Sequence, residues 1–360
     1  MLRWRWAPKF GDWAVGGGSR RTIVQSFIFA PPLILTLAVL GLPLGIYDHW
    51  LERAYHQSVQ GWGSWALDWG KEQVIAIIFG TLLVWLLYAV IRRSPQRWWF
   101  YFWLIALPII VLVAFVQPLV IDPLFFKFEP LQSAQPVLTG EIGKVVHRAG
   151  MNISPSHMFE MEASAKLNSL NAYVTGVGAS KRVVVWDTTI SRMTVPETLS
   201  VFGHEMGHYV LGHIFKGIAF SAGVLFVFLY LGFRLVRWSL ARWGAGWDIR
   251  GAHDWASLPL LLLILSIFMF LGSPAFNAFS RYQEHQADVY GLEVIRGLVP
   301  DSRQVAAQAF QVLGEIDLAD PHPSPFIRFW LYSHPPLDER IEFALHYDPW
   351  EKGETPEFVR

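Results

Sequence analysis

The residues best suited to chemistry lie in one short stretch, FGHEMGHYVLGH, at positions 202–213. His204 and His208 are four residues apart, and on a helix that turns by about 100° per residue they lie within roughly 40° of each other. Their imidazoles can then converge on one metal ion. Glu205 follows the first histidine, so its carboxylate can take a proton from a water held by that metal. The stretch therefore predicts a hydrolytic metal site, against the alternative of a helix that carries histidines by accident.

A hydrolytic zinc site needs a third protein ligand and one open position. Glu284, in SRYQEHQAD, is the candidate, and Asp288 lies one turn later, where it can hold the far ring nitrogen of a ligand histidine. His285 is the rival ligand from the same turn, and a solvated helix face is the alternative for the whole cluster. His213 comes five residues after His208, about 140° round a helix, and is expected to face away from the metal.

The elements that must position these residues can also be predicted. Pro196 and Glu197 suit the first turn of the histidine helix, and residues 196–237 are expected to form one long helix. Gly207 and Gly212 each cost a helix roughly 1 kcal/mol relative to Ala. We expect such glycines where another element must approach closely.

The composition limits the class of protein. The chain has 360 residues, of which 53% are apolar and only 16% are charged, below the roughly one quarter usual for soluble domains. The formal net charge is zero, so nothing indicates a nucleic-acid partner. The chain has no cysteine, which excludes disulfides and thiolate ligands. A metal must therefore be held by His, Asp or Glu.

Five segments are long and apolar enough to cross a bilayer, which takes about 20 residues. They are residues 23–47, 73–91, 99–121, 217–233 and 257–279. Most of the 18 tryptophans lie near the ends of these runs, as in an aromatic belt at the membrane surface.

Two further segments are soluble in character. One contains two expected strands, residues 171–176 and 181–187, joined by a Gly-rich turn at 177–180. We therefore predict a mainly α protein, a polytopic membrane helix bundle with a small α+β domain. The expected regions are an N-terminal region with three transmembrane helices (1–121) and a catalytic segment with the hairpin and the histidine helix (122–216). Two further transmembrane helices (217–279) and a C-terminal segment with the third metal ligand (280–360) follow.

Several stretches together resemble the type I CAAX prenyl endopeptidases, integral-membrane gluzincin zinc metalloproteases of the a-factor-converting type. The matching pieces occur in the family's order: VIDPLFFKFEPL (120–131), LNAYVTGVGASKRVVVWDTT (170–189), GHEMGHY (203–209), SRYQEHQAD (280–288) and SHPPLDERIE (333–342). The quality-control proteases of the HtpX type share HExxH and the downstream Glu, but the DPLF and NAY pieces are more similar to the prenyl endopeptidases.

The resemblance implies roles around a single zinc ion in a zincin-like domain. His204, His208 and Glu284 would bind one zinc per chain. Glu205 would be the general base, and Asp288 would support a ligand from behind.

The resemblance also implies residues that handle the substrate. His334, in SHPP, would stabilise the oxyanion with Arg340 close by, while Asn171 and Ala172 would pair with the substrate backbone from an edge strand. From the residues alone, SHPP could equally be a capped turn, Arg340 a surface residue, and NAY an ordinary hairpin.

The implied function is a membrane-embedded zinc endopeptidase acting near the C-terminus of prenylated CAAX-type or other membrane-associated substrates. Its partners would be a peptide or protein, with or without a prenyl group, and the lipid bilayer. The alternatives are degradation of membrane proteins, as by the HtpX-type proteases, and a non-catalytic scaffold or transporter with a structural metal. Family members have seven spans, so the chain is expected to begin just before the family's third span, with a smaller or more open chamber.

The two signals for membrane orientation conflict. The basic residues before the first span and after the second and fourth place those regions in the cytoplasm, and the catalytic segment outside it. The resemblance implies a cytoplasmic catalytic side, in a bacterial inner membrane or an endoplasmic reticulum membrane, and we give it precedence.

Overall fold

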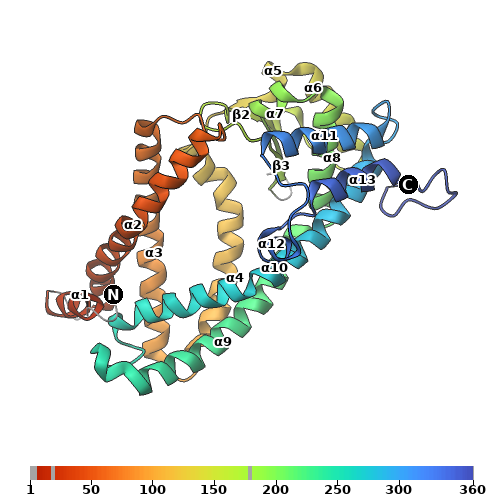
Figure 1. Cartoon of the computed structure of the whole chain (residues 1–360). Helices are drawn as coiled ribbons and strands as arrows, with labels where there is room; N and C mark the ends of the chain where they lie inside the picture. The colour runs from red at the N-terminus through yellow and green to blue at the C-terminus, as the bar shows by residue number, and fades with distance from the viewer. Residues whose placement is uncertain (1–5, 18–20, 177–180, 360) are drawn as a thin grey trace. The chain divides into compact units, whose positions relative to one another are not determined.

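The computed structural model describes residues 6–17, 21–176 and 181–359. The chain forms two compact units, each assembled from separated segments. The first comprises residues 1–51, 61–112 and 218–272, and the second residues 52–60, 113–217 and 273–360. Figure 1 traces the chain and labels its elements.

Long apolar helices dominate the first unit. Within the described residues, five helical segments are long and apolar enough to cross a membrane, in agreement with the five expected spans: Thr22–Ala54, Trp62–Arg93, Trp98–Leu124, His213–Trp247 and Trp255–Ile295. The helices are α1 (Trp6–Gly16), α2 (Thr22–Ala54), α3 (Trp62–Arg93), α4 (Trp98–Val116), α9 (His213–Trp247) and α10 (Leu258–Ile295). The segments after Trp247 and before Ser273 belong to this unit, whereas the last turns of α10 belong to the second.

Not every tryptophan in the first unit can lie in an aromatic belt. Trp98 and Trp255 are each only 2% exposed. Trp255 packs on Phe29 and Tyr88, and the Arg92 guanidinium lies 4.2 Å from its ring centroid. Trp98 lies edge-on to Phe233 of α9. Both tryptophans stand where a helical segment begins, yet they are core residues because other helices of their unit cover them.

The second unit contains a four-stranded sheet in the order β1-β2-β4-β3. Its strands are β1 (Phe128–Pro130), β2 (Met158–Met161), β3 (Ala172–Thr175) and β4 (Arg182–Trp186). β2 and β4 are parallel, and the other two pairs are antiparallel. The predicted strand pair is confirmed as β3 and β4, while the expected turn at 177–180 lies outside the described residues. β3 lies at the edge of the sheet.

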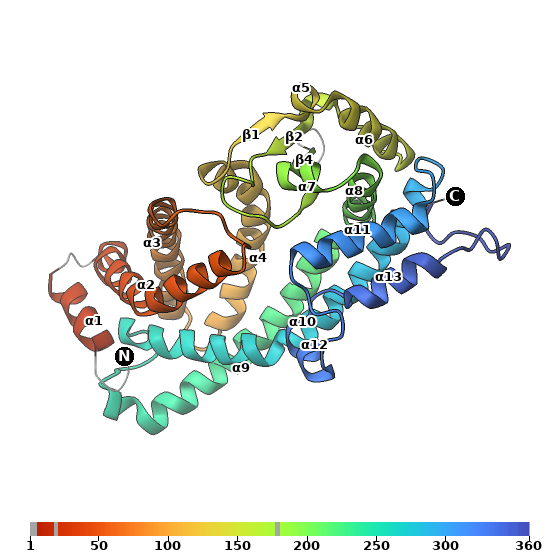
Figure 2. The ribbon, with the colours of Figure 1, turned by 45° about the horizontal axis from the view of Figure 1, so that its top comes forward.

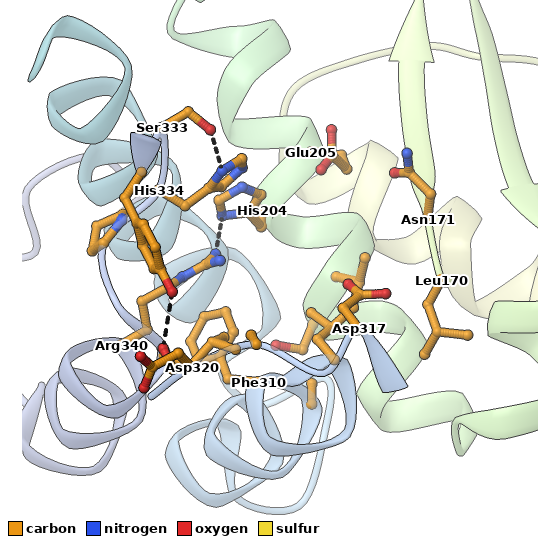
Figure 3. Close-up of a pocket in the computed structure, with 18 of the residues that line it drawn as sticks. Leu170, Asn171, His204, Glu205, Phe310, Asp317, Asp320, Ser333, His334 and Arg340 are labelled. Carbon is orange, nitrogen blue, oxygen red and sulfur yellow. Dashed lines mark hydrogen bonds between the residues drawn. The ribbon is translucent and has the colours of Figure 1, made fainter. Parts of the chain in front are cut away.

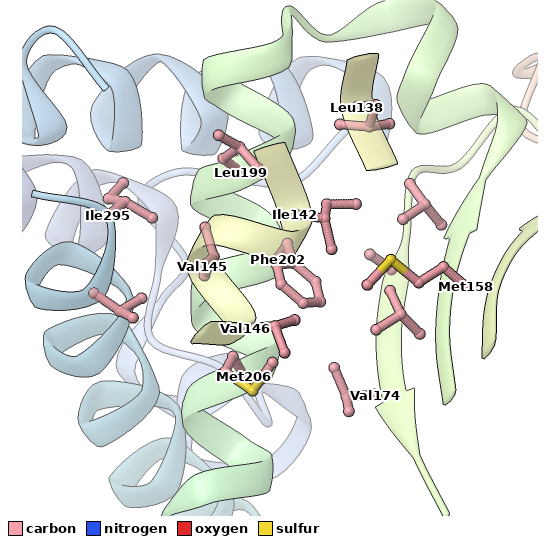
Figure 4. Packing of buried hydrophobic residues seen from close by; sticks show 14 of the residues in the cluster. Leu138, Ile142, Val145, Val146, Met158, Val174, Leu199, Phe202, Met206 and Ile295 are labelled. Carbon is pink, nitrogen blue, oxygen red and sulfur yellow. The ribbon is translucent and has the colours of Figure 1, made fainter. Parts of the chain in front are cut away.

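Helices cover the sheet and complete this unit (Figure 2). They are α5 (Leu131–Ala134), α6 (Pro136–Arg148), α7 (Asp187–Arg192), α8 (Val195–Val210), α11 (Ser302–Ile316), α12 (Pro325–Leu331) and α13 (Leu337–His346). α6 and α8 pack their apolar faces against β2, β3 and β4, with the end of α10 behind them (Figure 4). Ile142, Met158 and Phe202 are fully buried in this core. Burial of this kind contributes about 25 cal/mol per Å² of apolar surface, which holds α8 in place.

The histidine helix begins where the sequence predicts and ends earlier. Thr194 and Glu197 form a reciprocal capping box, in which the Glu197 carboxylate accepts from the Thr194 backbone N–H at 2.7 Å. Such a cap stabilises a helix by about 1 kcal/mol. The predicted single helix over 196–237 is wrong, because α8 ends at Val210 and α9 begins at His213. Gly212 lies between them with φ +68°, a conformation that favours glycine.

Candidate active site

Two helices of the second unit bring the predicted metal ligands together. α8 carries His204 and His208 on one face, and the last turns of α10 carry Glu284. The Nε2 atoms of the two histidines lie 3.1 Å apart, and the Glu284 oxygens lie 3.2 Å from His204 Nε2 and 3.4 Å from His208 Nε2. These three residues form a group that could hold a metal ion. The rival, His285, is exposed and its ring lies against Phe343, outside this group.

The donor atoms fit a metal by spacing and by chemistry. Ligand atoms at roughly 2.0–2.1 Å from a tetrahedral metal lie roughly 3.3–3.4 Å from one another, close to the separations seen. Asp288 Oδ1 lies 2.8 Å from His204 Nδ1, so the carboxylate accepts the ring proton there and leaves Nε2 with a lone pair. That lone pair faces a carboxylate oxygen of Glu284 at 3.2 Å. Two acceptors at this distance repel each other unless a cation or a proton lies between them.

Glycines allow α8 and α10 to approach this closely. A Cβ on Gly291 would lie 2.9 Å from the backbone nitrogen of His204, and one on Gly207 would lie 3.1 Å from Ala287 Cα. The expected close approach is therefore confirmed at Gly207. It is wrong at Gly212, where a Cβ would meet nothing within 4 Å and the positive φ is the reason for glycine.

Arg340 lies behind His204 rather than at the surface. It is 8% exposed, and its Nε and Nη2 bind the two Asp288 oxygens at 2.9 and 2.6 Å. Nη2 also lies 3.4 Å from His204 Nδ1. The bidentate pair fixes the Asp288 carboxylate, which in turn fixes the His204 ring. The same guanidinium lines the cleft described next.

A cleft of roughly 470 Å³ opens beside the ligand group (Figure 3). Glu205 and Asn171 line it, and Ser333 and His334 stand on the other side of the view. Its apolar lining includes Val201 of α8 and Ala309, Phe310 and Leu313 of α11. The cleft can therefore hold a peptide with an apolar portion next to the candidate metal ligands.

Glu205 lines this cleft and is not one of the three grouped ligands. Burial raises the pKa of the Glu205 carboxyl above its ordinary value, and the neighbouring His204 opposes this shift. A raised pKa suits a general base, which must accept a proton and later release it. A bound dication would pull the pKa in the opposite direction.

His334 reaches the ligand group from a loop. Its Nε2 lies 3.3 Å from Glu284 Oε2, and its Nδ1 lies 2.9 Å from the Ser333 hydroxyl. α10 holds this loop, since Asn277 donates to the carbonyl of Trp330 at 2.7 Å and Arg281 donates to that of Tyr332 at 2.5 Å. The same helix thus positions both Glu284 and His334.

Asn171 and Ala172, the two residues predicted to pair with the substrate, lie in different surroundings. Asn171 lines the cleft, and its backbone carbonyl accepts from the Trp186 N–H and the Thr189 hydroxyl. Ala172 is the first residue of β3 and is fully buried.

Two acidic residues and a histidine were not predicted to lie here. Asp317 and Asp320 line the far end of the cleft, brought there by the chain that leaves α11. His213 does not face away from the site as expected, because its Nδ1 lies 2.9 Å from His208 Nδ1. The signal for this return was Gly212, whose type favours a helix end before His213.

Comparisons with known proteins agree with this geometry. The chain matches the model of peptidase family M48 over residues 133–348, and the CAAX prenyl protease N-terminal model, described as five membrane helices, over residues 1–127. The matched N-terminal residues hold three of the candidate spans.

Relatives come from bacteria and eukaryotes. The chain is 38% identical over 318 residues to "Uncharacterized metalloprotease YhfN" of Bacillus subtilis, covering 88% of this chain and 72% of that protein. It is 31% identical over 281 residues to the CAAX prenyl protease 1 homolog of Dictyostelium discoideum, covering 75% of this chain and 62% of that protein.

The crystal structure of Ste24p from S. mikatae is similar over 96% of this chain and 82% of that one, with 25% identity and a TM-score of 0.82. The similarity in fold, like the sequence matches, includes residues of both units. Since the family model covers more than half of the chain, and the membrane helices and the His-His-Glu group accompany it, the chain belongs to peptidase family M48 and is a multi-pass membrane metalloprotease.

Proposed function

We propose that the chain is a zinc endopeptidase that cleaves peptide bonds near the C-terminus of prenylated CAAX-type substrates. The observation that carries this proposal is the position of Glu205, which lines the cleft directly beside the grouped His204, His208 and Glu284. Relatives named CAAX prenyl protease 1 support the substrate class.

The ligand chemistry favours zinc. Two imidazole nitrogens and one carboxylate are the set that catalytic zinc binds while keeping one position open. Zinc, when bound there, lowers the pKa of a water molecule and polarises the scissile carbonyl.

The residues of the chain would then perform the proton transfers and hold the substrate. Glu205 takes the proton of the attacking water and later delivers it to the leaving amine. His334 donates a hydrogen bond to the carbonyl oxygen as negative charge develops on it. The edge strand β3, which begins at Ala172 next to Asn171 of the cleft wall, would pair with the substrate backbone and set its register.

Two features suit a substrate anchored in the bilayer. Along the chain, α8 is followed directly by α9, and Glu284 lies on α10, so the site adjoins two candidate spans. The cleft also has apolar walls, with Val201, Phe310 and Leu313 among its lining residues. A peptide with a lipid portion fits both.

The test is made on the purified protein in detergent. We expect one zinc per chain by elemental analysis, and faster cleavage of a farnesylated CAAX peptide than of the same peptide without the farnesyl group. Equal cleavage of both peptides would contradict prenyl recognition and favour general degradation of membrane proteins. Absence of zinc from active protein would contradict the metal assignment.

We further propose that the catalytic unit faces the cytoplasm, and the absence of cysteine makes this simple to test. Lys144 is exposed on α6, so Lys144→Cys would carry a single thiol in that unit. In intact cells we expect a membrane-impermeant maleimide to leave this thiol unlabelled until the membrane is permeabilised. Labelling before permeabilisation would place the catalytic unit outside.

A further inference from the structure

His213 holds a position that the proposed zinc chemistry does not yet use. It is the first residue of α9 and is only 4% exposed. On a continuous helix it would lie about 140° away from His208. The chain instead breaks at Gly212, and His213 returns so that its Nδ1 lies 2.9 Å from His208 Nδ1. Gln283 on α10 donates to the His213 carbonyl at 3.2 Å and holds it there.

The other nitrogen of His213 is buried near α10. Gln286 lies three residues after Gln283 on that helix, so it lies on the same face as the side chain that binds the His213 carbonyl. Across the residues that the structure describes, His213 Nε2 and Gln286 Oε1 are both buried and neither has a close, well-aligned hydrogen bond. Leaving a buried polar atom unpaired is costly, and a rotation of the Gln286 side chain would pair the two atoms with each other.

This arrangement determines where the ring protons lie. Gln286 Oε1 can only accept, so a neutral His213 paired with it would carry its proton on Nε2 and a lone pair on Nδ1. That lone pair accepts the Nδ1 proton of His208. His208 Nε2 is then left with its lone pair, 3.1 Å from His204 Nε2 and 3.4 Å from Glu284 Oε1.

We propose that His213 is a positioning residue that orients His208 and fixes its tautomer for metal binding, with Gln286 fixing the tautomer of His213. The proposal rests on the metal site assigned above. Asp288 does the same for His204, but with a carboxylate that Arg340 neutralises. A neutral imidazole adds no charge, so His208 is oriented without reducing the positive charge available to polarise a substrate.

Variants can separate the hydrogen bond from packing. His213→Leu removes the acceptor, whereas His213→Asn keeps an oxygen near the place of the ring Nδ1. Gln286→Leu removes the far partner. His285→Leu is the matched control, since His285 neighbours Gln286 but is exposed and packs edge-on against Phe343.

The readouts are zinc affinity, measured by competition with a chromogenic chelator, and the absorption spectrum of the cobalt-substituted protein. Loss of a residue that orients a metal ligand costs about 10- to 100-fold in metal affinity. We expect that loss, and an altered cobalt spectrum, for His213→Leu, a smaller loss for Gln286→Leu, and values within about threefold of wild type for His213→Asn and His285→Leu.

Three results would overturn the proposal. The first is wild-type zinc affinity and cobalt spectrum in folded His213→Leu. The second is an equal loss in His213→Asn, which would mean that ring packing matters and the acceptor does not. The third is an unchanged zinc affinity in Gln286→Leu, which decides the question if His213→Leu does not fold. If wild type binds no metal, the proposed function fails as well, whereas an active wild type with unaffected variants leaves that function intact.

Discussion

Glu205→Gln is expected to keep the bound zinc and to lose peptide cleavage by about 10²- to 10⁴-fold, the range that a general acid–base contributes. Glu205 lies outside the grouped His204, His208 and Glu284, so the isosteric amide leaves those ligands in place. The amide cannot accept a proton from water. Zinc content and the initial rate on the farnesylated peptide, measured on one preparation, check both halves of the prediction.

Glu141→Gln on α6 is the matched control, because it makes the same change in the same unit. Glu141 pairs with Lys144 at the surface at 2.7 Å, and surface pairs of this kind contribute little to stability. We expect wild-type activity for this variant. Full activity of Glu205→Gln would instead mean that Glu205 is not the general base, and loss of zinc from it would mean that Glu205 is a ligand.

The parts of the site that are local in sequence could be predicted. His204 and His208 are one helical turn apart, and α8 forms as its capping residues indicate. Glu284 and Asp288 are also one turn apart, and α10 does present both to His204. A periodicity argument works in such cases because one regular helix carries all the information.

Contacts between distant segments could not be derived from periodicity. Arg340 and Asp288 are 52 residues apart, and only the tertiary fold shows that they pair. His213 was misplaced for another reason. The apolar residues after it continue a helical pattern, and that pattern hid the turn at Gly212. Gly212 indicated that the helix could end before His213, but a glycine alone does not show the direction that the chain takes after it.

The contact between α8 and α10 leads to the second large effect, which we expect from Gly291→Ala. A Cβ at this position would lie 2.9 Å from the His204 backbone nitrogen and 3.2 Å from its Cα. Backbone atoms cannot rotate away as a side chain can, so the two helices must move apart. Overpacking of this kind costs about 1–3 kcal/mol in the free energy of unfolding.

The separation of these helices also sets the distance from His204 and His208 to Glu284, which is 3.2 to 3.4 Å between donor atoms. A shift of a few tenths of an ångström spoils all of these separations together. Gly291→Ala should therefore lower the melting temperature and weaken zinc binding at the same time. Melting curves with and without added zinc, together with chelator competition, measure the two effects separately.

Gly143→Ala provides the control for glycine replacement itself. Gly143 lies within α6, and a Cβ there would meet nothing within 4 Å. Alanine at an unhindered helical position stabilises by about 0.5–1 kcal/mol relative to glycine, so this variant should melt at or above the wild-type temperature and keep its zinc. If Gly291→Ala behaved like Gly143→Ala, the close approach of α8 and α10 would not be what holds the ligands at metal-binding distance. The Asp288–Arg340 pair would then be the main contact that positions His204.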